Sequence, residues 1–312
     1  MPSELSIGGV CRLADHGVIR ARGADAATFL QSQLTNDVAG LDAGSARLAG
    51  FCSAKGRLQA SFVVWRPADD EFLLACAGDL LAATLKRLSM FVLRAKCKLS
   101  DASDEVRLFG IAGAPAAAML GDADVLQVRA HGATSLLRVA DAAGVPRAWV
   151  VAPKEHEVDV SATPTMNLET WRWLEVESGI VTIEAATVDR FVPQMVNFEL
   201  VGGVDFQKGC YPGQEVVARS QYRGTTKRRT LLFDCDAVPI AGQDVFASAT
   251  AGEPAGTVAN AAPHPSHAGG SALVEIRLAA LDDELRLGAV DGPPLRRREL
   301  PYTVPLDATL AS

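Results

Sequence analysis

The sequence predicts a mixed α+β protein that ends in an all-β region. Apolar residues recur at helical spacing in two stretches of the first hundred residues, with strand-like runs between and after them. Beyond Thr230 the pattern changes to short strand-like runs separated by turn residues. The chain has 312 residues, of which 48% are hydrophobic and 21% are charged, so it can bury a large core and is expected to divide into two or three units.

The first half of the chain alternates helices and strands. Asp25 is placed to cap a helix in which Phe29, Leu30 and Leu34 fall at helical spacing, and this helix is expected to end at Asn36–Asp37. The other elements expected here are strands over 47–52, 56–65, 71–76 and 106–111 and a helix over 81–92.

The second half begins with short apolar runs between residues 126 and 151, which suggest strands of undefined register. Asn167 is a suitable N-cap for a helix with Trp171 and Leu174 on one side, and Gly179 stands where a C′ glycine ends such a helix. A small barrel or sandwich is expected to follow. Its strands are predicted over 230–235, 243–247, 256–259 and 272–276.

The charge balance excludes one class of function. The chain has 37 acidic and 30 basic side chains, which gives a net charge of −7. A strongly basic nucleic-acid binder is therefore not expected, and we predict no direct contact with nucleic acid. The basic run made by Arg223, Lys227, Arg228 and Arg229 is expected to be a solvated face.

Cysteine spacing and the chain's uncharged stretches bear on the cellular compartment. The six cysteines lie more than twenty positions apart, so no CxxC metal or redox pair exists. Met1–Glu4 do not begin a secretory or transit signal. The longest stretch without charged residues, Pro254 to Val274, contains prolines and glycines that do not suit a spanning helix. We therefore expect reduced thiols in the cytoplasm and no membrane association.

The most unusual segment is Gly-rich and runs from Gly202 to Glu215, followed by Arg219. Glycines at 209 and 213 permit positive φ, and Lys208 with Arg219 would lower the pKa of Cys210. An exposed thiolate here is a candidate for thiol chemistry or for transient contact with a metal or cluster. The alternative is that Cys210 is a small buried hydrophobe and that Lys208 and Glu215 form a solvated pair.

Other standard motifs are absent or weak. The sequence has no phosphate-binding GxxxxGK[ST], no GxGxxG after a strand and no HExxH. His264 and His267 lie three apart in a Pro-rich loop, but without nearby cysteines or carboxylates a surface position is favoured over a metal site. Trp171 and Trp173 face different sides of their helix, so one is expected in the core and the other at an interface or pocket.

Several segments together resemble the YgfZ family, folate-binding proteins related to the T protein (aminomethyltransferase) of the glycine cleavage system. The most specific is Lys-Gly-Cys-Tyr-x-Gly-Gln-Glu, which comprises Lys208, Gly209, Cys210, Tyr211, Gly213, Gln214 and Glu215. Segments that agree in order are 29–38, 54–57, 177–180 and 191–197. The resemblance spans nearly the whole chain and favours a functional role for Cys210 over the buried alternative.

The resemblance implies a T-protein-like, three-domain ring with two interleaved α+β domains and a C-terminal small β-barrel. The implied limits are 1–46 plus 112–228 for a folate-binding domain, 47–111 for an inserted ferredoxin-like domain, and 229–312 for the barrel. It also implies tetrahydrofolate, or a one-carbon derivative of it, as the ligand. The contacts it implies are Glu177 at the pterin, with Asn36, Asp37 and Lys55 near the opening.

The T protein carries an aspartate shortly after its Lys-Gly pair, and that aspartate serves methylene transfer. The corresponding positions here are Gln59, Ala60 and Ser61, none of which is a carboxylate. The T protein also lacks the cysteine at position 210. The resemblance therefore implies that folate binding is retained and that aminomethyl transfer by the same mechanism is not.

Three functions are open, and the first of them is what the resemblance to the YgfZ family implies. The first is a folate-binding accessory protein that supports iron–sulfur cluster assembly, repair or maintenance in client enzymes, including enzymes that methylthiolate tRNA. Its partners would be client or assembly proteins that bind transiently, and Cys210 would be its candidate reactive residue. The second is a folate-dependent one-carbon transferase or demethylase acting on a small amine. The third is a structural scaffold with no folate affinity.

Overall fold

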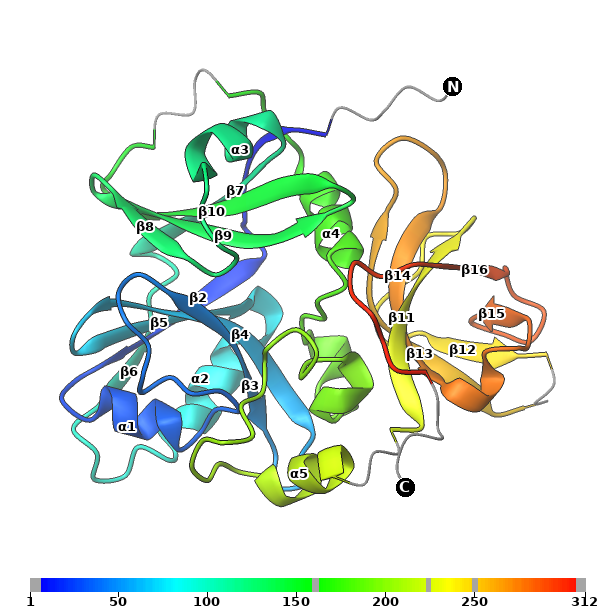
Figure 1. Ribbon diagram of the computed structural model, residues 1–312, viewed down its shortest axis with the longest axis horizontal. Coiled ribbons are helices and arrows are strands. Elements are labelled where there is room, and N and C mark those ends of the chain that lie inside the picture. Colours follow the sequence, from blue (N-terminus) through cyan, green and yellow to red (C-terminus); the bar gives the residue numbers. More distant parts are fainter. Residues whose placement is uncertain (1–6, 159–162, 223–225, 249–251, 307–312) are drawn as a thin grey trace. The chain divides into compact units, whose positions relative to one another are not determined.

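The computed structural model describes residues 7–158, 163–222, 226–248 and 252–306 (Figure 1). Met1–Glu4 and Arg223, which entered the sequence predictions, lie outside these residues. The chain forms two compact units. Unit 1 comprises 1–31, 38–47 and 62–171, and unit 2 comprises 32–37, 48–61 and 172–312. The predicted limits of three domains stay a prediction.

One sheet of unit 1 is five-stranded and antiparallel, with the order β1-β7-β10-β9-β8. Its strands are β1 (Gly9–Arg12), β7 (Val106–Ala112), β8 (Val128–His131), β9 (Thr134–Ala142) and β10 (Val145–Pro153). The helix α3 (Ala114–Leu120) packs against β10 and β7, where Leu120 joins a core with Ile111 and Val150. The strands β8, β9 and β10 lie in the stretch 126–151, for which the sequence predicted strands but not their register.

A second five-stranded sheet has the order β3-β4-β5-β2-β6. Its strands are β2 (His16–Arg22), β3 (Ala46–Cys52), β4 (Leu58–Ala68), β5 (Glu71–Ala77) and β6 (Lys98–Asp101). The division between the two units passes through β3 and β4. The helix α2 (Leu81–Ser89) packs against β2 and β6 and buries Thr84 and Leu88 (Figure 1). Because β6 is an edge strand, the chain between α2 and β6 lies at the margin of this sheet.

The first helix is shorter than the sequence predicts. The helix α1 covers Ala26–Gln31, and the Asp25 carboxylate accepts the Lys96 N–H at 2.6 Å. The Gln31 side chain accepts the N–H groups of Val38 and Ala39, at 2.8 and 3.1 Å. The expected extension to residue 36 is therefore wrong, because the residues after Gln31 take up loop contacts that a continuing helix would prevent.

The helix α4 (Leu168–Glu177) is the element predicted most closely. The Asn167 side chain accepts the Thr170 N–H at 2.7 Å, which confirms it as the N-cap. Gly179 follows the helix with φ +73°, the left-handed conformation of a C′ residue. Trp171 and Trp173 are both buried. The expectation that one of them lies at an interface or pocket stays a prediction.

The C-terminal part of unit 2 is a six-stranded sheet that curls into a half-barrel (Figure 1). Its order is β15-β12-β13-β14-β11-β16. The strands are β11 (Arg228–Cys235), β12 (Asp244–Ala247), β13 (Pro254–Pro263), β14 (Gly270–Arg277), β15 (Leu285–Leu287) and β16 (Leu295–Arg298). The two edges approach through an isolated bridge between Arg286 and Pro294. The predicted barrel is thus a curled sheet with a core that includes Leu231, Phe233 and Val274.

Two helices escaped the sequence predictions, α3 and α5 (Gln214–Tyr222). The residues of α5 directly follow the Gly-rich segment, whose glycines and proline masked the helical pattern. Within the described ranges, no helix combines the length and the apolar character that crossing a bilayer requires.

Candidate functional site

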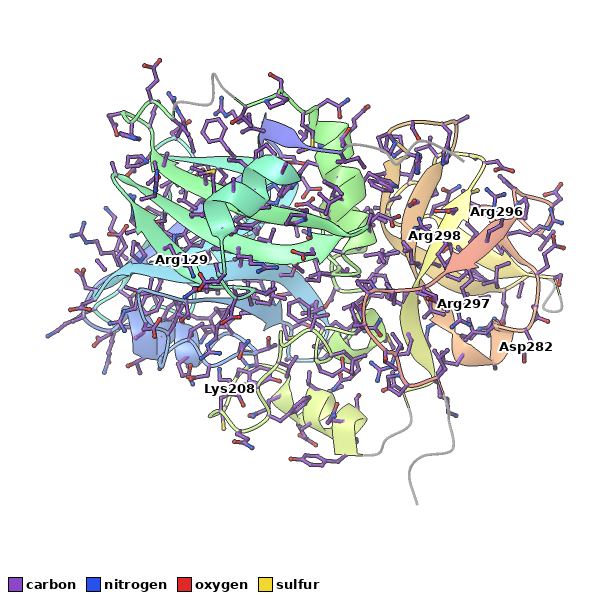
Figure 2. The ribbon with its side chains drawn as sticks, turned by 45° about the horizontal axis from the view of Figure 1, so that its top comes forward. Arg129, Lys208, Asp282, Arg296, Arg297 and Arg298 are labelled. Atoms are coloured by element: carbon purple, nitrogen blue, oxygen red, sulfur yellow. The ribbon has the colours of Figure 1, made fainter. Side chains whose placement is uncertain are left out.

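The thiol of Cys210 is exposed, on a loop that we call the Cys210 loop (residues 202–213). The neighbouring Gly209 is also exposed, whereas Lys208 and Tyr211 on either side are buried. The Lys208 ammonium lies 5.2 Å from the centre of the Tyr211 ring and donates to the Leu34 carbonyl at 2.5 Å. Figure 2 shows Lys208 on the loop that leads into α5. The exposed dipeptide is thus presented between two inward-pointing side chains.

The segment 34–37 fixes the start of the Cys210 loop. The Thr35 hydroxyl donates to the Gly203 carbonyl at 2.6 Å and accepts the Gly50 N–H at 2.7 Å. The Asn36 amide donates to the carbonyls of Leu48 and Gly202, each at 2.7 Å. The Asn36 side-chain oxygen accepts the Asp37 N–H at 2.8 Å. Asn36, expected near a folate, is therefore a structural residue of this loop.

The end of the Cys210 loop packs against the turn that carries Lys55. Gly213 has φ +78°, and a Cβ there would stand 2.4 Å from the Ser53 carbonyl oxygen and 2.6 Å from Gly56. Gly56 has φ +69° and faces Val216 of α5. Only glycine fits this backbone-to-backbone contact. The structure thus joins two motifs that are far apart in the sequence, and it leaves Lys55 exposed on the turn.

Two sequence expectations for this loop are wrong. Gly209 does not have positive φ, and a Cβ at this position would meet open space. Glu215 pairs with Arg219, at 2.9 Å in the first turns of α5, and not with Lys208. Arg219 is therefore engaged by a neighbour four positions earlier, which leaves Lys208 as the cation closest in sequence to Cys210.

Burial controls the ionisation of Lys208. Desolvation lowers the pKa of Lys208 to about 8, against the opposing charges of Asp37, Asp205 and a Cys210 thiolate. Burial also raises the pKa of the Tyr211 hydroxyl, which stays neutral. Lys208 can therefore give up or take a proton close to neutral pH, next to an exposed thiol.

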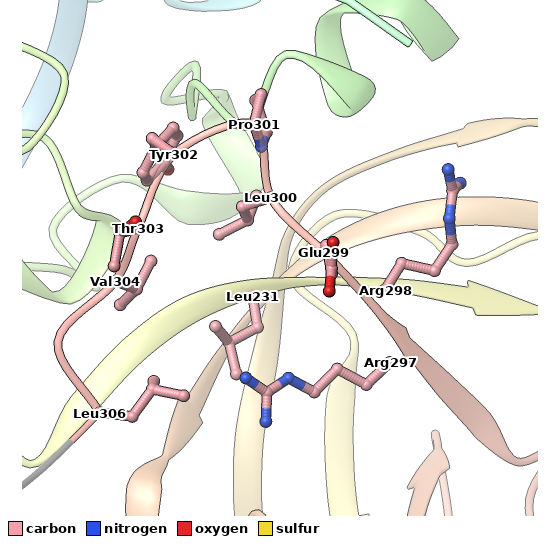
Figure 3. A pocket seen from close by; sticks show the side chains of 10 residues that line it. All are labelled: Leu231, Arg297, Arg298, Glu299, Leu300, Pro301, Tyr302, Thr303, Val304 and Leu306. Atoms are coloured by element: carbon pink, nitrogen blue, oxygen red, sulfur yellow. The ribbon is translucent and has the colours of Figure 1, made fainter.

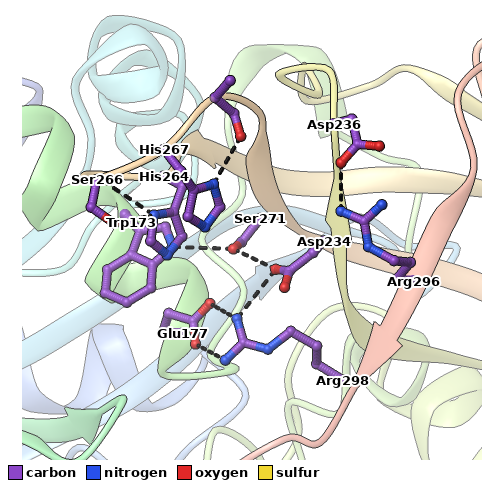
Figure 4. Close-up of polar contacts among 11 residues, drawn as sticks. Trp173, Glu177, Asp234, Asp236, His264, Ser266, His267, Ser271, Arg296 and Arg298 are labelled. Carbon is purple, nitrogen blue, oxygen red and sulfur yellow. Dashed lines mark hydrogen bonds and ion pairs between the residues drawn. The ribbon is translucent and has the colours of Figure 1, made fainter. Parts of the chain in front are cut away.

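Glu177 belongs to a separate polar network in unit 2 (Figure 4). Its buried carboxylate accepts two hydrogen bonds from Arg298, at 2.7 and 3.0 Å. Arg298 also donates to Asp234 at 3.2 Å, and Asp234 accepts the Ser271 hydroxyl at 2.8 Å. The Ser271 oxygen accepts the Trp173 indole N–H at 3.1 Å. Burial raises the pKa of Glu177, and Arg298 opposes that shift.

Two histidines extend this network in a way that the sequence did not predict. His264 packs edge-to-face on Trp173, with ring centres 4.9 Å apart, and stacks on His267 at 3.5 Å. Desolvation and His267 lower the pKa of His264. The His-x-x-His spacing before the glycines was the available signal, and in the structure these two rings stack. Among the described residues, no group of three metal-ligating side chains is present.

The positions that correspond to the T-protein aspartate carry no acid and differ in their contacts. The Gln59 side-chain oxygen is buried, and it has no hydrogen-bond partner within the described part of the chain. Ala60 is buried, and the Ser61 hydroxyl accepts the Ile183 N–H at 2.9 Å. Gln59 therefore offers an unused acceptor to a ligand that donates a hydrogen bond.

A hollow of about 640 Å³ lies beside β16 (Figure 3). It is lined by Leu231, by residues 297–304 and by Leu306. Arg296, Arg297 and Arg298 follow one another along β16 (Figure 2). Arg298 connects the hollow to Glu177, and the Tyr302 hydroxyl donates to the Gly179 carbonyl at 2.7 Å. The predicted helix end at Glu177 and the C-terminal segment therefore meet in this region.

The basic run after α5 is paired and not simply solvated. Arg228 binds Glu275, with a second contact at 2.8 Å, and buried Arg229 binds buried Glu199 at 2.5 Å. Of this run, Lys227 is exposed. The expectation of a solvated basic face is therefore wrong for the two arginines that the structure describes.

Comparison with known proteins places this geometry in context. The GCVT N-terminal domain model matches residues 8–151. A "tRNA-modifying protein YgfZ" of Klebsiella pneumoniae is 33% identical over 256 residues, covering 75% of this chain and 74% of its own. The protein of the same name from Edwardsiella ictaluri is 36% identical over 252 residues, with the same coverage.

A solved structure extends the likeness to the fold. Glycine cleavage system aminomethyltransferase T from Bartonella henselae superposes with a TM-score of 0.72 at 17% identity. The match covers 95% of this chain and 86% of that one. The predicted T-protein-like α+β fold class is confirmed.

Proposed function

Because the chain belongs to the YgfZ family, we propose that it binds a reduced folate and uses Cys210 to support iron–sulfur enzymes. The observation that carries this proposal is the exposure of the Cys210 thiol. If the thiol were buried in the hydrophobic core, Cys210 could not react with a partner or ligand. The protein acts in the cytoplasm, where its six free cysteines stay reduced.

The residues of unit 2 fit a folate. A pterin presents N–H donors on one edge, and the buried Gln59 oxygen is an acceptor still in need of a donor. Glu177 is a second acceptor, although Arg298 occupies both of its oxygens in this structure. Asp37 and Lys55 remain proposed contacts, whereas the Asn36 amide is committed to the loop. When bound, the folate supplies a carrier for one-carbon units.

Cys210 provides the reactive group of this proposal. Its loop is fixed at both ends, by Thr35 and Asn36 before it and by Gly56 after it. Lys208 precedes Cys210 by two positions in the chain and can hold or release a proton near neutral pH. Such a thiolate suits brief contact with a cluster or a sulfur species that a partner protein carries, because one thiolate is a poor permanent anchor.

The transferase alternative has less support. Transfer by the T-protein route needs a carboxylate, and positions 59 to 61 supply an amide, a methyl group and a hydroxyl that is already bonded. The test is to incubate the protein with tetrahydrofolate and a methylated amine. If methylene-folate formed at catalytic turnover, the protein would be a transferase or demethylase and not an accessory protein.

The role of the cysteine is tested in cells that lack the native protein. The Cys210→Ala variant is expected to fail to restore a client iron–sulfur enzyme, read as the methylthiolated nucleoside content of tRNA. Cys235→Ala is the control, because Cys235 is also a free thiol but is buried, and it lies outside both the Cys210 loop and the basic residues near α2. Full restoration by Cys210→Ala would remove the cysteine from the function.

The folate site is tested by calorimetric titration with tetrahydrofolate. Gln59→Leu keeps the size of the side chain but removes the buried acceptor, and we expect affinity to fall roughly tenfold, the loss typical of one hydrogen bond. Gln221→Leu, at an exposed position of α5, is the control and should bind as the wild type does. If titration of the wild-type protein with tetrahydrofolate released or absorbed no heat of binding, the protein would be a structural scaffold without folate affinity.

A further inference from the structure

A second surface of the protein combines positive charge with exposed apolar groups. It is the chain from the last turn of α2 to the start of β6, residues 86–98, which we call the basic turn. It contains five of the chain's 30 basic residues and none of its 37 acidic ones. The five are Lys86, Arg87, Arg94, Lys96 and Lys98, and all are exposed. Such a concentration contrasts with the net charge of −7.

These cations are not neutralised within the protein. In the described residues, no ion pair involves any of the five side chains. The Asp25 carboxylate contacts this segment, but it accepts the backbone N–H of Lys96 and not a side-chain cation. Arg228 and Arg229, by contrast, are each held by a glutamate. The basic turn therefore keeps its charges available for an external anion.

Apolar side chains stand between the cations. Met90 is 68% exposed, Phe91 40% and Leu93 87%. Leu93 has φ +47°, a left-handed conformation that is unfavourable for a non-glycine residue, and no burial of its side chain offsets this cost. Successive turn hydrogen bonds, from Met90 N–H to Arg87 O and from Ala95 N–H to Val92 O, hold this shape. Apolar groups fixed in solvent in this way are characteristic of a binding surface.

We infer that the basic turn binds single-stranded or looped RNA, with its cations on phosphates and its apolar side chains against unstacked bases. Five unpaired cations without an intervening acid match a phosphate backbone better than the mixed charges of a protein surface. An exposed ring and neighbouring apolar groups suit bases that are splayed out of a helix. A lipid surface fits less well, because α2 turns its apolar side inward with Leu88 buried.

This inference differs from the expectation, drawn from composition, that the protein makes no direct contact with nucleic acid. Net charge averages over the whole surface, whereas binding depends on the local field within about 10 Å at 0.1 M salt. The inference goes beyond the proposed function, because the basic turn lies in unit 1 and contains none of the residues proposed for folate or thiol chemistry.

The test is fluorescence anisotropy with a labelled, unmodified tRNA transcript at 50 to 200 mM KCl. The variant Lys86→Gln/Arg94→Gln/Lys98→Gln is expected to bind at least tenfold more weakly, and its salt slope should fall by about 2, since each phosphate contact on a single strand contributes roughly 0.7. The control Lys227→Gln/Arg296→Gln/Arg297→Gln removes the same charge from unit 2 and should bind within twofold of the wild type.

The proposed contact with RNA bases is tested by a substitution that does not change the charge. Leu93→Asn keeps a residue that tolerates the left-handed conformation, so the fold is retained, and affinity should fall about threefold to tenfold with the salt slope unchanged. Equal weakening by both charge variants, or full affinity in Leu93→Asn, would overturn the inference. Binding to vesicles rich in phosphatidylserine but not to the transcript would also overturn it. Folate titration of the charge variant reports separately on the proposed function.

Discussion

The Cys210 loop and the Glu177 network differ in whether the functional group is exposed or buried. The Cys210 loop is held from outside, because Thr35 and Asn36 donate to its backbone carbonyls, while the Cys210 side chain itself remains exposed. In the Glu177 network, the charged groups satisfy one another, and the carboxylate is buried under Arg298. The thiol is therefore ready for a partner as the protein stands, whereas Glu177 becomes available to a ligand only if Arg298 moves or shares it.

This difference bears on the order of events at the two places. A folate that contacts Glu177 must compete with a bidentate ion pair, which is among the stronger side-chain interactions in proteins. A cluster or sulfur species that meets Cys210 needs no such displacement. We expect mutations in the loop to act through backbone shape and mutations in the network to act through charge.

The largest effect is expected from backbone shape in the Cys210 loop. Gly213→Ala places a Cβ 2.4 Å from the Ser53 oxygen at φ +78°, and it should lower the free energy of unfolding by about 3 kcal/mol or more. Gly209→Ala meets open space and should change it by less than about 0.5 kcal/mol. Urea unfolding of both variants measures the contrast. Similar losses from the two substitutions would show that the turn does not depend on the contact with Gly56.

The next effect concerns charge in the Glu177 network. Arg298→Met leaves a buried carboxylate unpaired and should cost about 2 to 3 kcal/mol at pH 7. The pKa of Glu177 is already raised by burial, and loss of Arg298 raises it further. The folded state then holds the proton more tightly than the unfolded chain, so stability is lost as pH rises above the ordinary value of 4.5.

The pH dependence distinguishes this mechanism from simple loss of packing. The stability difference between Arg298→Met and wild type should be small at pH 4 and should grow toward pH 7 in thermal unfolding scans. Arg296→Met, which removes an exposed pair with Asp236, is the matched control and should cost less than about 0.5 kcal/mol. A difference that is constant with pH would mean that Glu177 is not the group left unpaired.

Local patterns predicted the elements that depend on neighbours in sequence. The N-cap at Asn167, the glycine at 179 and the strands β11 to β14 of the C-terminal sheet all follow from residues a few positions apart, whereas β15 and β16 were missed. The helix after Asp25 was overextended, because its end depends on the Gln31 side chain bonding Val38, a contact that helical periodicity does not encode. The helix α5 was missed for a related reason, since it starts directly after a Gly-Pro-rich turn.

The exposure of the candidate site agrees with the sequence interpretation, but its contacts were not predictable, and its function stays a prediction. The motif around Cys210 marked a loop with an exposed cysteine, yet the partner of Lys208 is the carbonyl of Leu34, which is 174 positions away. Glu177 was singled out without Arg298, and the role of His264 beside Trp173 was missed. Contacts between distant segments are set by the tertiary fold, and local patterns in a single sequence do not predict them.

The third effect is a pH dependence that arises from Lys208. Its folded-state pKa of about 8 lies below the ordinary value of 10.5, so between these values the unfolded chain binds more protons than the folded protein. The free energy of unfolding should rise with pH across this window by at most about 1.4 kcal/mol per unit. Lys208→Met should lack this rise when the two proteins are compared by urea unfolding at pH 7.5, 8.5 and 9.5. Parallel curves would show that Lys208 is solvated like an ordinary lysine.

The smallest effect on stability, and the clearest one on chemistry, concerns Cys210 itself. Cys210→Ser should change the free energy of unfolding by less than about 0.5 kcal/mol, because its side chain is exposed. Cys52→Ser should cost about 1 to 3 kcal/mol, because it places a hydroxyl in a buried apolar site. In the native wild type, iodoacetamide should modify Cys210 well before Cys52 and Cys76, whose pKa values burial raises to about 12. Mass spectrometry of peptides from timed reactions measures this order, and earlier labelling of a buried cysteine would mean that the Cys210 loop is covered in solution.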